Sequence, residues 1–309
     1  MKDGIAVSSP VQVELEERKA IFKFEERAPT SLWRDAMRRL LRNKLAVAGM
    51  IILGVFLICA LFAPLVSPYD PTAQELTLRR QPPSPTHVFG LDDLGRDILS
   101  RVIYGSRLSL RVGVLSVIFA IVIGTLLGAV SGYWGGWADN MIMRLMDIML
   151  AFPALLLAIA IVAILGPGLL NMLIAIGIVS IPNYARLVRA QVLSVKEQDY
   201  VLAARAIGVT PIRMLFRSIL PNCITPIIVQ GTLGIATAIL DAAGLSFLGL
   251  GAQPPTPEWG AMLGEGRFSL FTAPHIIVFP GIAIMLTVLG FNLLGDGLRD
   301  ALDPRLRMD

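Results

Sequence analysis

Few side chains in this chain could do chemistry, and none has the spacing of a catalytic site. The stretch GLDDLGRD places Gly90 and Gly95 at the separation found in phosphate-binding loops. The next residues are Arg96 and Asp97, where such a loop requires lysine followed by serine or threonine. The sequence therefore predicts no nucleotide site of this type, and we expect the chain not to hydrolyse ATP itself.

The histidines and cysteines indicate neither a metal site nor a disulfide framework. The two histidines, His87 and His275, have no other ligand-type residues at the spacing of known metal sites. Cys59 lies inside an apolar run and Cys223 at the start of another, with no CxxC pair. We therefore expect no metal and no catalytic residue.

The composition indicates a membrane protein. Of the 309 residues, 55% are hydrophobic and only 16% are charged, whereas about a quarter of the residues of a soluble domain are charged. The net charge of +4 is not gathered on one basic face, because the basic residues flank apolar runs; this excludes a nucleic-acid-binding surface. We expect an all-helical, polytopic membrane protein.

Five long apolar runs predict six membrane-spanning helices. These runs are 45–66, 112–138, 148–185, 224–250 and 276–294. The third run has 38 residues and would reach roughly 57 Å as one helix, so the sequence GPG at 166–168 is expected to divide it into two spans. The predicted transmembrane domain covers 45–298, between an N-terminal segment, 1–44, and a C-terminal tail, 299–309.

The basic residues predict the orientation. If both termini are cytoplasmic, the cytoplasmic segments contain 20 of the 27 lysines and arginines, as the positive-inside rule requires. TSLWRDAMRRLLRNK, from Thr30, is expected to form an amphipathic helix on the membrane surface, with a plain basic anchor as the alternative. The N-terminal segment has no apolar core of the signal-peptide type.

An external loop at about 67–111 is the exception to the charge rule. It contains six arginines that nothing else in the sequence explains, and we expect Asp92, Asp93 and Asp97 to pair with some of them. A second external loop contains QPPTPEWG, in which Trp259 suits the membrane interface. This loop is expected either to anchor the chain there or to line the external mouth of a path.

The largest cytoplasmic segment, at about 190–222, contains DYVLAARAIGVTPIRMLFRSILPN, a predicted helical hairpin. Gly208 suits the left-handed residue that ends a first helix. Thr210 is expected to cap a second helix that has Pro211 at its first position, and Pro221 is expected to end or bend that helix at the membrane. A plain connector would not need two short capped helices, so we expect a rigid structure facing the cytoplasm.

This hairpin resembles the motif EAA-x3-G-x9-I-x-L-P of ABC importer permeases. Aligned on Gly208, the matching residues are Ala203, Ala204, Leu220 and Pro221. The chain departs from the motif at Leu202, where the motif has glutamate, and at Ser218, where it has isoleucine.

Three further stretches are similar to the second permease subunit of dipeptide, oligopeptide and glutathione importers. They are FGLDDLGRDILSRVIYGSRLSL from Phe89, GAQPPTPEWGAML from Gly251 and FNLLGDGLRDALDPRLR from Phe291. The resemblance covers about 45–307. It implies a type I ABC importer permease in the cytoplasmic (inner) membrane.

The resemblance also implies partners. These would be a homologous second permease, two cytoplasmic ATPase subunits that bind ATP and magnesium, a periplasmic solute-binding protein and membrane lipid, with no nucleic acid and no cofactor in this chain. The hairpin would couple the ATPases to the membrane helices by rigid-body movement. The residues assigned to coupling are Asp199, Tyr200, Ala203, Ala204, Arg205, Gly208, Thr210, Pro211, Arg213, Arg217 and Pro221. For Arg217, the alternative to a coupling role is anchoring to lipid headgroups.

Asp241 and Asn292 are the candidate residues of the transport path. Asp241 is an acidic residue deep in a predicted span, where a carboxylate facing lipid would cost at least about 2.5 kcal/mol. It is therefore expected either to meet the solute or to bond structurally to the second permease. Two rival functions stay open: a nickel importer permease of the same branch, and an ion-driven transporter with Asp241 as its ion site. The sequence does not identify the solute.

Two further features concern helix packing. The stretch GTLLGAVSG places three glycines on one helix face, which allows close packing either within the chain or with the second permease; these are Gly124, Gly128 and Gly132. Arg144 and Asp147 are expected to form an ion pair, or to mark a helix end, at the cytoplasmic edge of the third span.

Overall fold

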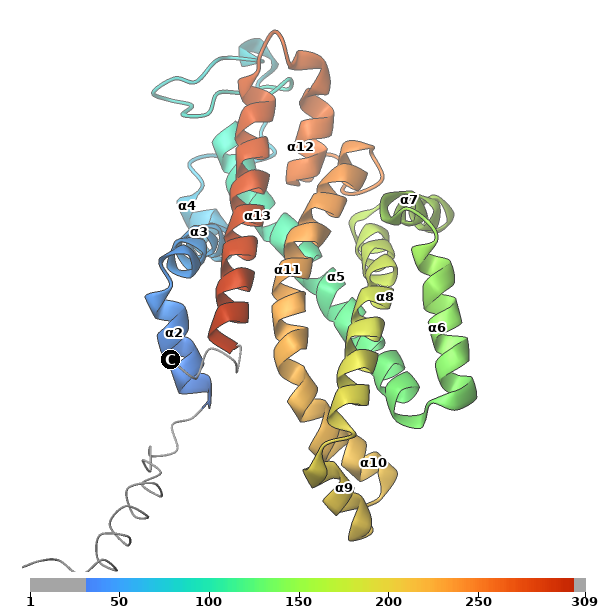
Figure 1. Cartoon of the computed structure of the whole chain (residues 1–309). Helices are drawn as coiled ribbons and strands as arrows, with labels where there is room; N and C mark the ends of the chain where they lie inside the picture. The colour runs from blue at the N-terminus through green and yellow to red at the C-terminus, as the bar shows by residue number, and fades with distance from the viewer. Residues whose placement is uncertain (1–31, 303–309) are drawn as a thin grey trace, which may run out of the picture.

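The computed structural model describes residues 32–302, and this part of the chain is helical without named strands. The N-terminal half contains α2 (Leu32–Arg42), α3 (Lys44–Leu61), α4 (Ala63–Val66), α5 (Ile98–Trp134) and α6 (Gly136–Leu150). The rest contains α7 (Ala154–Leu165), α8 (Leu169–Val195), α9 (Asp199–Ala206), α10 (Pro211–Met214), α11 (Leu220–Phe247), α12 (Trp259–Gly266) and α13 (His275–Leu302). Figure 1 shows the long helices side by side, with the loop before α5 at one end and α9 and α10 at the other.

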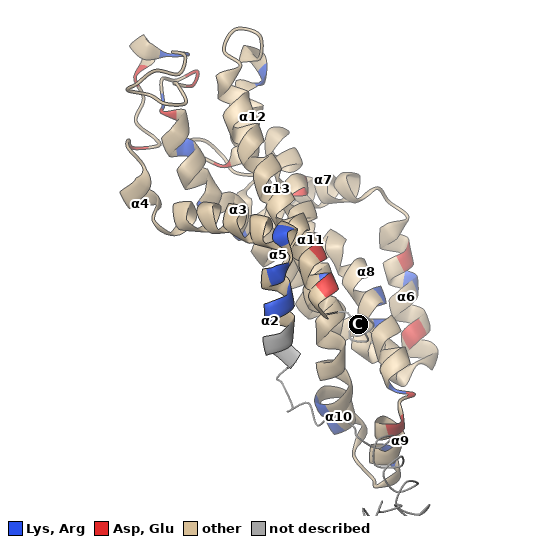
Figure 2. Ribbon diagram, turned by 60° about the vertical axis from the view of Figure 1, so that its left-hand side comes forward, with Lys and Arg blue, Asp and Glu red and all other residues tan. Residues whose placement is uncertain are grey.

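The helices account for up to six membrane spans. Five are continuous and sufficiently long and apolar: α3, α5, α8, α13 and the stretch Pro211–Phe247, which includes α10 and α11. The sixth consists of α6 and α7, which meet at a bend of 94°. An all-helical fold with six spans is what the apolar runs predict. In Figure 2, charged residues gather mainly on the external loop, α2, α6 and the hairpin, while the long helices are mostly uncharged.

The boundaries of the second and third spans differ from the sequence-based expectation. Helix α5 begins at Ile98, so the last part of the segment expected to be an external loop, 98–111, is helical. Helix α6 begins at Gly136 and includes residues 139–147, which separate the apolar runs of the second and third predicted spans. The predicted break at GPG is confirmed, because α7 ends at Leu165 and α8 begins at Leu169.

The glycine face of α5 packs against α8 within the chain. A Cβ on Gly124 would lie 2.7 Å from the Cβ of Tyr184, and one on Gly132 would lie 3.0 Å from the carbonyl oxygen of Arg189. Gly128 lies between them against the Ala185 carbonyl. Side chains at these positions would push the two helices apart, so the intrachain alternative is the one that the structure adopts.

Ion pairs, two of whose arginines are buried, explain several arginines before and within α5. Arg96 contacts Asp92 through Nε at 2.6 Å and Glu265 through Nη2 at 2.6 Å, while Arg101 contacts the same Glu265 at 3.1 Å. Arg80 pairs with Asp93 at 2.5 Å. The expected pairing of Asp92 and Asp93 is therefore confirmed, and Glu265, on α12, is a partner that the sequence did not reveal.

Asp97, the third aspartate expected to pair with an arginine, pairs with no arginine among the described residues. It accepts a hydrogen bond from the Ser100 amide as the N-cap of α5 and lies 2.9 Å from Nδ1 of His87. Trp259, expected at the membrane interface, is instead fully buried, and its indole N–H donates to the Val102 carbonyl at 2.9 Å. This bond satisfies the indole inside the protein, so the residue needs no polar interface.

Helix α2 lies beside the end of α13. Leu40 of α2 is buried with Ala46 and Ala301, and a Cβ on Gly297 would lie 3.2 Å from Cδ1 of Leu40. The two ends of the described chain are therefore on the same side of the molecule (Figure 1). The expected amphipathic helix is present from Leu32 onward, and the rest of the N-terminal segment lies outside the described residues.

Candidate functional site

The hairpin expected at 190–222 consists of α9 and α10 at the lower end of the molecule in Figure 1. Gly208 follows α9 with a φ of +83°, and the Val209 amide donates to the Ala204 carbonyl at 3.1 Å. A Cβ on Gly208 would meet no atom within 4 Å. Glycine is favoured here by its backbone conformation and not by lack of space, as the sequence predicts.

The second helix of the hairpin differs from the expectation in two details. Thr210 occupies the N-cap position of α10, but its side chain makes no capping hydrogen bond; its carbonyl accepts from the Met214 amide at 2.9 Å. Pro221 does not end the helix. A π-helical turn, Leu215–Ile219, joins α10 to α11, and Pro221 lies in the first turn of α11. The wider turn accommodates a residue that has no N–H to donate.

A small apolar core holds the hairpin rigidly on the ends of α8 and α11. Val201, Met214, Leu215 and Ile219 are each no more than 2% exposed and pack with Val192 of α8. This core ties the hairpin to both membrane helices that flank it, so a force on the hairpin reaches both.

Tyr200 adds a polar tie between α9 and the start of α11. Its hydroxyl donates to the Ser218 carbonyl at 3.3 Å and accepts from the Asn222 amide nitrogen at 3.0 Å. Partial burial raises the pKa of the Tyr200 hydroxyl above its usual value, so the hydroxyl keeps the proton that it donates.

The exposed surface of the hairpin is more apolar than its sequence suggests. The side chains of Ile207 (83% exposed), Ile212 (64%) and Phe216 (56%) are directed away from the small core. Sequence reasoning missed these three residues. A signal was present, because Ile212 and Phe216 are four residues apart on either side of the buried Met214 and Leu215. An isolated apolar residue in an amphipathic pattern, however, is usually assigned to a core. Such a patch is typical of a surface that binds another protein.

The three coupling arginines lie on the same stretch of the chain as these apolar residues. Arg205, Arg213 and Arg217 are exposed, and none of them forms an ion pair with another described residue. The candidates Asp199, Tyr200, Ala203, Ala204 and Pro211 lie on α9 and α10, and Pro221 lies at the start of α11. The structure therefore brings together the whole set of residues that the sequence assigns to coupling.

The two candidate path residues lie apart from the hairpin. Asp241 is half-buried on α11, six residues before its end at Phe247, and Asn292 is exposed on α13. Neither forms a hydrogen bond or ion pair with any residue in the described part of the chain. Their side chains are thus free to meet water, solute or another subunit.

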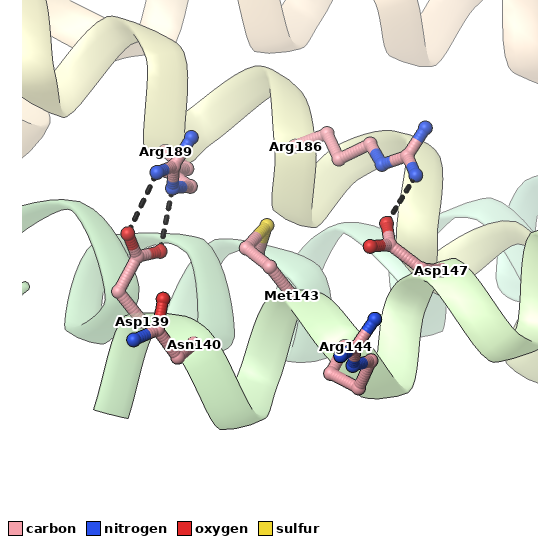
Figure 3. A pocket seen from close by; sticks show the side chains of 7 residues that line it. All are labelled: Asp139, Asn140, Met143, Arg144, Asp147, Arg186 and Arg189. Atoms are coloured by element: carbon pink, nitrogen blue, oxygen red, sulfur yellow. Dashed lines mark hydrogen bonds and ion pairs between the residues drawn. The ribbon is translucent and has the colours of Figure 1, made fainter. Parts of the chain in front are cut away.

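A charged groove between α6 and α8 is a feature that the sequence did not predict. Its volume is about 720 Å³, and Figure 3 shows its lining from both helices, namely Asp139, Asn140, Met143, Arg144, Asp147, Arg186 and Arg189. Arg189 donates to both oxygens of Asp139 at 2.6 Å. Asp147 accepts from Nη2 of Arg186 at 2.5 Å.

The pairing in this groove corrects an expectation. Arg144 and Asp147 do not pair with each other; Asp147 binds Arg186, and Arg144 has no ion pair within residues 32–302. Both helices supply the charges, so the groove becomes apparent only once α6 is placed against α8. In the described part of the chain, no group of three or more histidine, cysteine, aspartate or glutamate side chains could hold a metal ion.

The chain matches two family models. One is the binding-protein-dependent transport system inner membrane component, over residues 124–308. The other is the N-terminal TM domain of oligopeptide transport permease C, over residues 31–83. The second model covers α2, α3 and the start of the external loop.

Curated relatives match along nearly the whole chain. The dipeptide transport system permease protein DppC of Alkalihalophilus pseudofirmus is 54% identical, over 90% of this chain and 91% of the relative. The di/tripeptide transport system permease protein DppC of Pseudomonas aeruginosa is 53% identical, over 86% and 89%. The glutathione transport system permease protein GsiD of Pectobacterium atrosepticum is 49% identical, over 89% and 92%.

A similar fold occurs in a solved structure. A chain of the MetNI methionine ABC transporter, in an inward-facing conformation, superposes with a TM-score of 0.53 at 19% identity. The superposition covers 66% of this chain and 97% of that chain. At this identity the likeness concerns the helical fold alone.

Proposed function

The chain belongs to the family of binding-protein-dependent transport system inner membrane components. We propose that it is the permease subunit of an ATP-driven importer for small peptides. The identity of 49–54% to relatives named for dipeptide, di/tripeptide and glutathione transport carries the assignment of the solute class. Membership of this family makes the chain a multi-pass inner membrane protein and a transport component rather than an enzyme.

The family implies ATPase and solute-binding partners, and we propose their arrangement more closely. A homologous second permease completes the path, and two ATPase subunits, which hold ATP and magnesium, bind on the side of the hairpin. The solute-binding protein delivers from the opposite side. Both termini are then cytoplasmic, as the distribution of lysines and arginines along the chain predicts.

The hairpin is the proposed contact with the ATPases. Ile207, Ile212 and Phe216 offer an apolar patch to a soluble partner, and Arg205 and Arg213 offer guanidinium groups to its carboxylates. Arg217 lies nearest the membrane and suits either an acidic partner residue or a lipid headgroup.

The continuity of the helices supports transmission by rigid-body movement. The stretch from Pro211 to Phe247 is helical throughout apart from one π-helical turn, and the buried core of the hairpin also holds Val192 of α8. A tilt of the hairpin on closure of the ATPases would therefore tilt α8 and α11 together. Such movements are the usual basis of alternating access.

Asp241 and Asn292 are the proposed contacts with the path. A carboxylate in a span is expected to face protein or a water-filled cavity, and Asp241 has no partner among the described residues. It could meet the amino group of an arriving peptide, or a group of the second permease. Asn292 is exposed on α13 and is available to bond across a subunit boundary.

Transport by the purified complex tests this function. The chain would be produced with its second permease, ATPases and solute-binding protein and reconstituted into proteoliposomes. We expect accumulation of at least one of dialanine, triglycine and glutathione with ATP, and none with a non-hydrolysable ATP analogue. Accumulation of Ni²⁺ but of no peptide, or uptake that follows an ion gradient without ATP, would contradict the proposal.

A further inference from the structure

Two charged residues of the groove between α6 and α8, Arg186 and Asp147, lie well inside helices that belong to candidate membrane spans. Arg186 is nine residues before the end of α8 at Val195, about 13 Å of helical rise. Asp147 is eleven residues after the start of α6 at Gly136, about 16 Å of rise. Both helices belong to candidate membrane spans. These two charges therefore lie within the helices and not in the loops that connect them.

Charges within a membrane-spanning helix require protein or water around them. A charged side chain facing hydrocarbon is costly, and those found in membrane spans line bundle interiors or water-filled cavities. Here the side chains of Arg186 and Asp147 are 50% and 53% exposed in this chain, and the groove beside them has a volume of about 720 Å³. A cavity of this size is in the range that binds small molecules.

Some charged groups of the groove have no ion-pair or hydrogen-bond partner within the described part of the chain. Asp139 and Arg189 satisfy each other through two hydrogen bonds. Asp147 uses only Oδ1, toward Arg186, and its Oδ2 has no partner in the described part of the chain. Arg144 has no ion pair or hydrogen bond with any residue in 32–302. The groove thus offers one free guanidinium and one free carboxylate oxygen.

The separation of these two free groups suits the distance between the two charged ends of a small peptide. Arg144 and Asp147 are three residues apart on α6, so they lie on one helix face with Cβ atoms about 5–6 Å apart. The ends of an extended dipeptide are about 7 Å apart, and the long arginine side chain can adjust to that separation. Asn140, one turn before Arg144, adds an amide to the same lining.

We propose that the groove between α6 and α8 is a solute-binding station in which Arg144 binds the carboxylate of a small peptide and Asp147 binds its amino group. The station rests on the proposed peptide-import function and assigns residues to it. The two ion pairs hold α6 and α8 at the width of the groove. Three arginines and two aspartates give the groove a net charge of +1, which one carboxylate would neutralise.

Direct binding to the assembled complex tests the station without the solute-binding protein. The complex in nanodiscs would be titrated with radiolabelled dialanine, with dialanine amide, which lacks the carboxylate, and with N-acetyl-dialanine, which lacks the charged amine. The parent should prefer dialanine to each derivative by about tenfold, because a charge-assisted hydrogen bond is lost.

Two variants test the two ends separately. Arg144→Gln should abolish the preference for dialanine over its amide while keeping the preference over N-acetyl-dialanine. Asp147→Asn should do the reverse. Arg299→Gln, at an exposed arginine on α13 outside the groove, is the matched control and should keep both preferences.

The outcomes separate the station from the function on which it rests. A parent that binds dialanine no better than its derivatives, or either variant with both preferences intact, overturns the station, and Arg144 then serves a lipid phosphate or another subunit. Uptake by the same parent complex in proteoliposomes is measured in parallel. If the parent takes up peptide but the variants keep both binding preferences, only the station is refuted. If the parent takes up no peptide, the importer assignment itself is refuted.

Discussion

The guanidinium of Arg189 donates to both carboxylate oxygens of Asp139, from Nε to Oδ1 and from Nη2 to Oδ2, each at 2.6 Å. Asp139 also accepts a hydrogen bond from the Ser131 hydroxyl near the end of α5. One carboxylate therefore joins α5, α6 and α8 where the chain turns between the second and third spans. Lys196 strengthens the same region by donating to the Gly132 carbonyl at 3.2 Å.

This relationship predicts a loss of stability in Asp139→Asn. The asparagine cannot accept both hydrogen bonds of the guanidinium, and Arg189 is left partly buried without its counter-ion. We expect a loss of about 1–3 kcal/mol, measured as a lower melting temperature of the purified complex. Asp300→Asn, at an exposed position of α13, serves as the control. An unchanged melting temperature in Asp139→Asn would show that the pair contributes nothing to stability.

The same pair shows why the start of α6 was not predictable from the sequence. Asp139, Arg144 and Asp147 interrupt an apolar run, and the local pattern places such residues at a helix end or in a loop. Their partners, Arg189 and Arg186, are 50 and 39 residues away. Local patterns carry no information about contacts at that separation, so α6 was predicted to start too late.

Gly128→Leu should prevent the close packing of α5 and α8. Gly128 lies against the Ala185 carbonyl, and a Cβ there would also come within 2.9 Å of the Cβ of Val188. Backbone cannot move aside as a flexible side chain can, so we expect little assembled complex in membranes, measured by co-purification with the ATPases. Gly54→Leu is the matched control, since a Cβ on Gly54 meets nothing within 4 Å. Normal assembly of Gly128→Leu would contradict the packing described here.

Gly208→Val should impair coupling while leaving the fold intact. Valine resists the left-handed conformation by about 1–2 kcal/mol, so the turn between α9 and α10 would open and the patch around Ile207 would change shape. We expect the variant to reach the membrane but to retain less ATPase and transport more slowly.

Gly208→Asn provides the rescue control, because asparagine tolerates the left-handed conformation. It should restore most of the transport rate, measured in proteoliposomes at equal complex content. A normal rate in Gly208→Val would mean that this turn does not transmit the movement of the ATPases.

The conformation of the hairpin could be predicted from the sequence, whereas the surroundings of Trp259 and Glu265 could not. Gly208 and Pro211 act through their own backbone preferences, and the structure places them as those preferences require. Trp259 and Glu265 depend on α12 folding against α5, where Trp259 meets Val102 and Glu265 meets Arg101. Conformation set by a residue itself was predictable, and conformation set by a distant partner was not.

Asp241→Asn tests the proposed contact with the path. The substitution keeps the size of the side chain and its hydrogen bonding but removes the negative charge. If the carboxylate meets the charged amino group of the arriving peptide, uptake should fall by about tenfold, the cost of one charge-assisted hydrogen bond, while assembly stays normal. Thr237→Ser, one turn away on the exposed face of α11, is the control and should transport at the parental rate.

A structural bond from Asp241 to the second permease predicts a different result. In that case Asp241→Asn would lower the recovery of the paired permeases, and peptide uptake per assembled complex would remain at the parental value. Comparing ATP-dependent uptake with co-purification at matched complex content separates the two roles. Parental uptake together with parental assembly would remove Asp241 from both, because a half-buried carboxylate with no partner in residues 32–302 would then have neither a transport nor an assembly role.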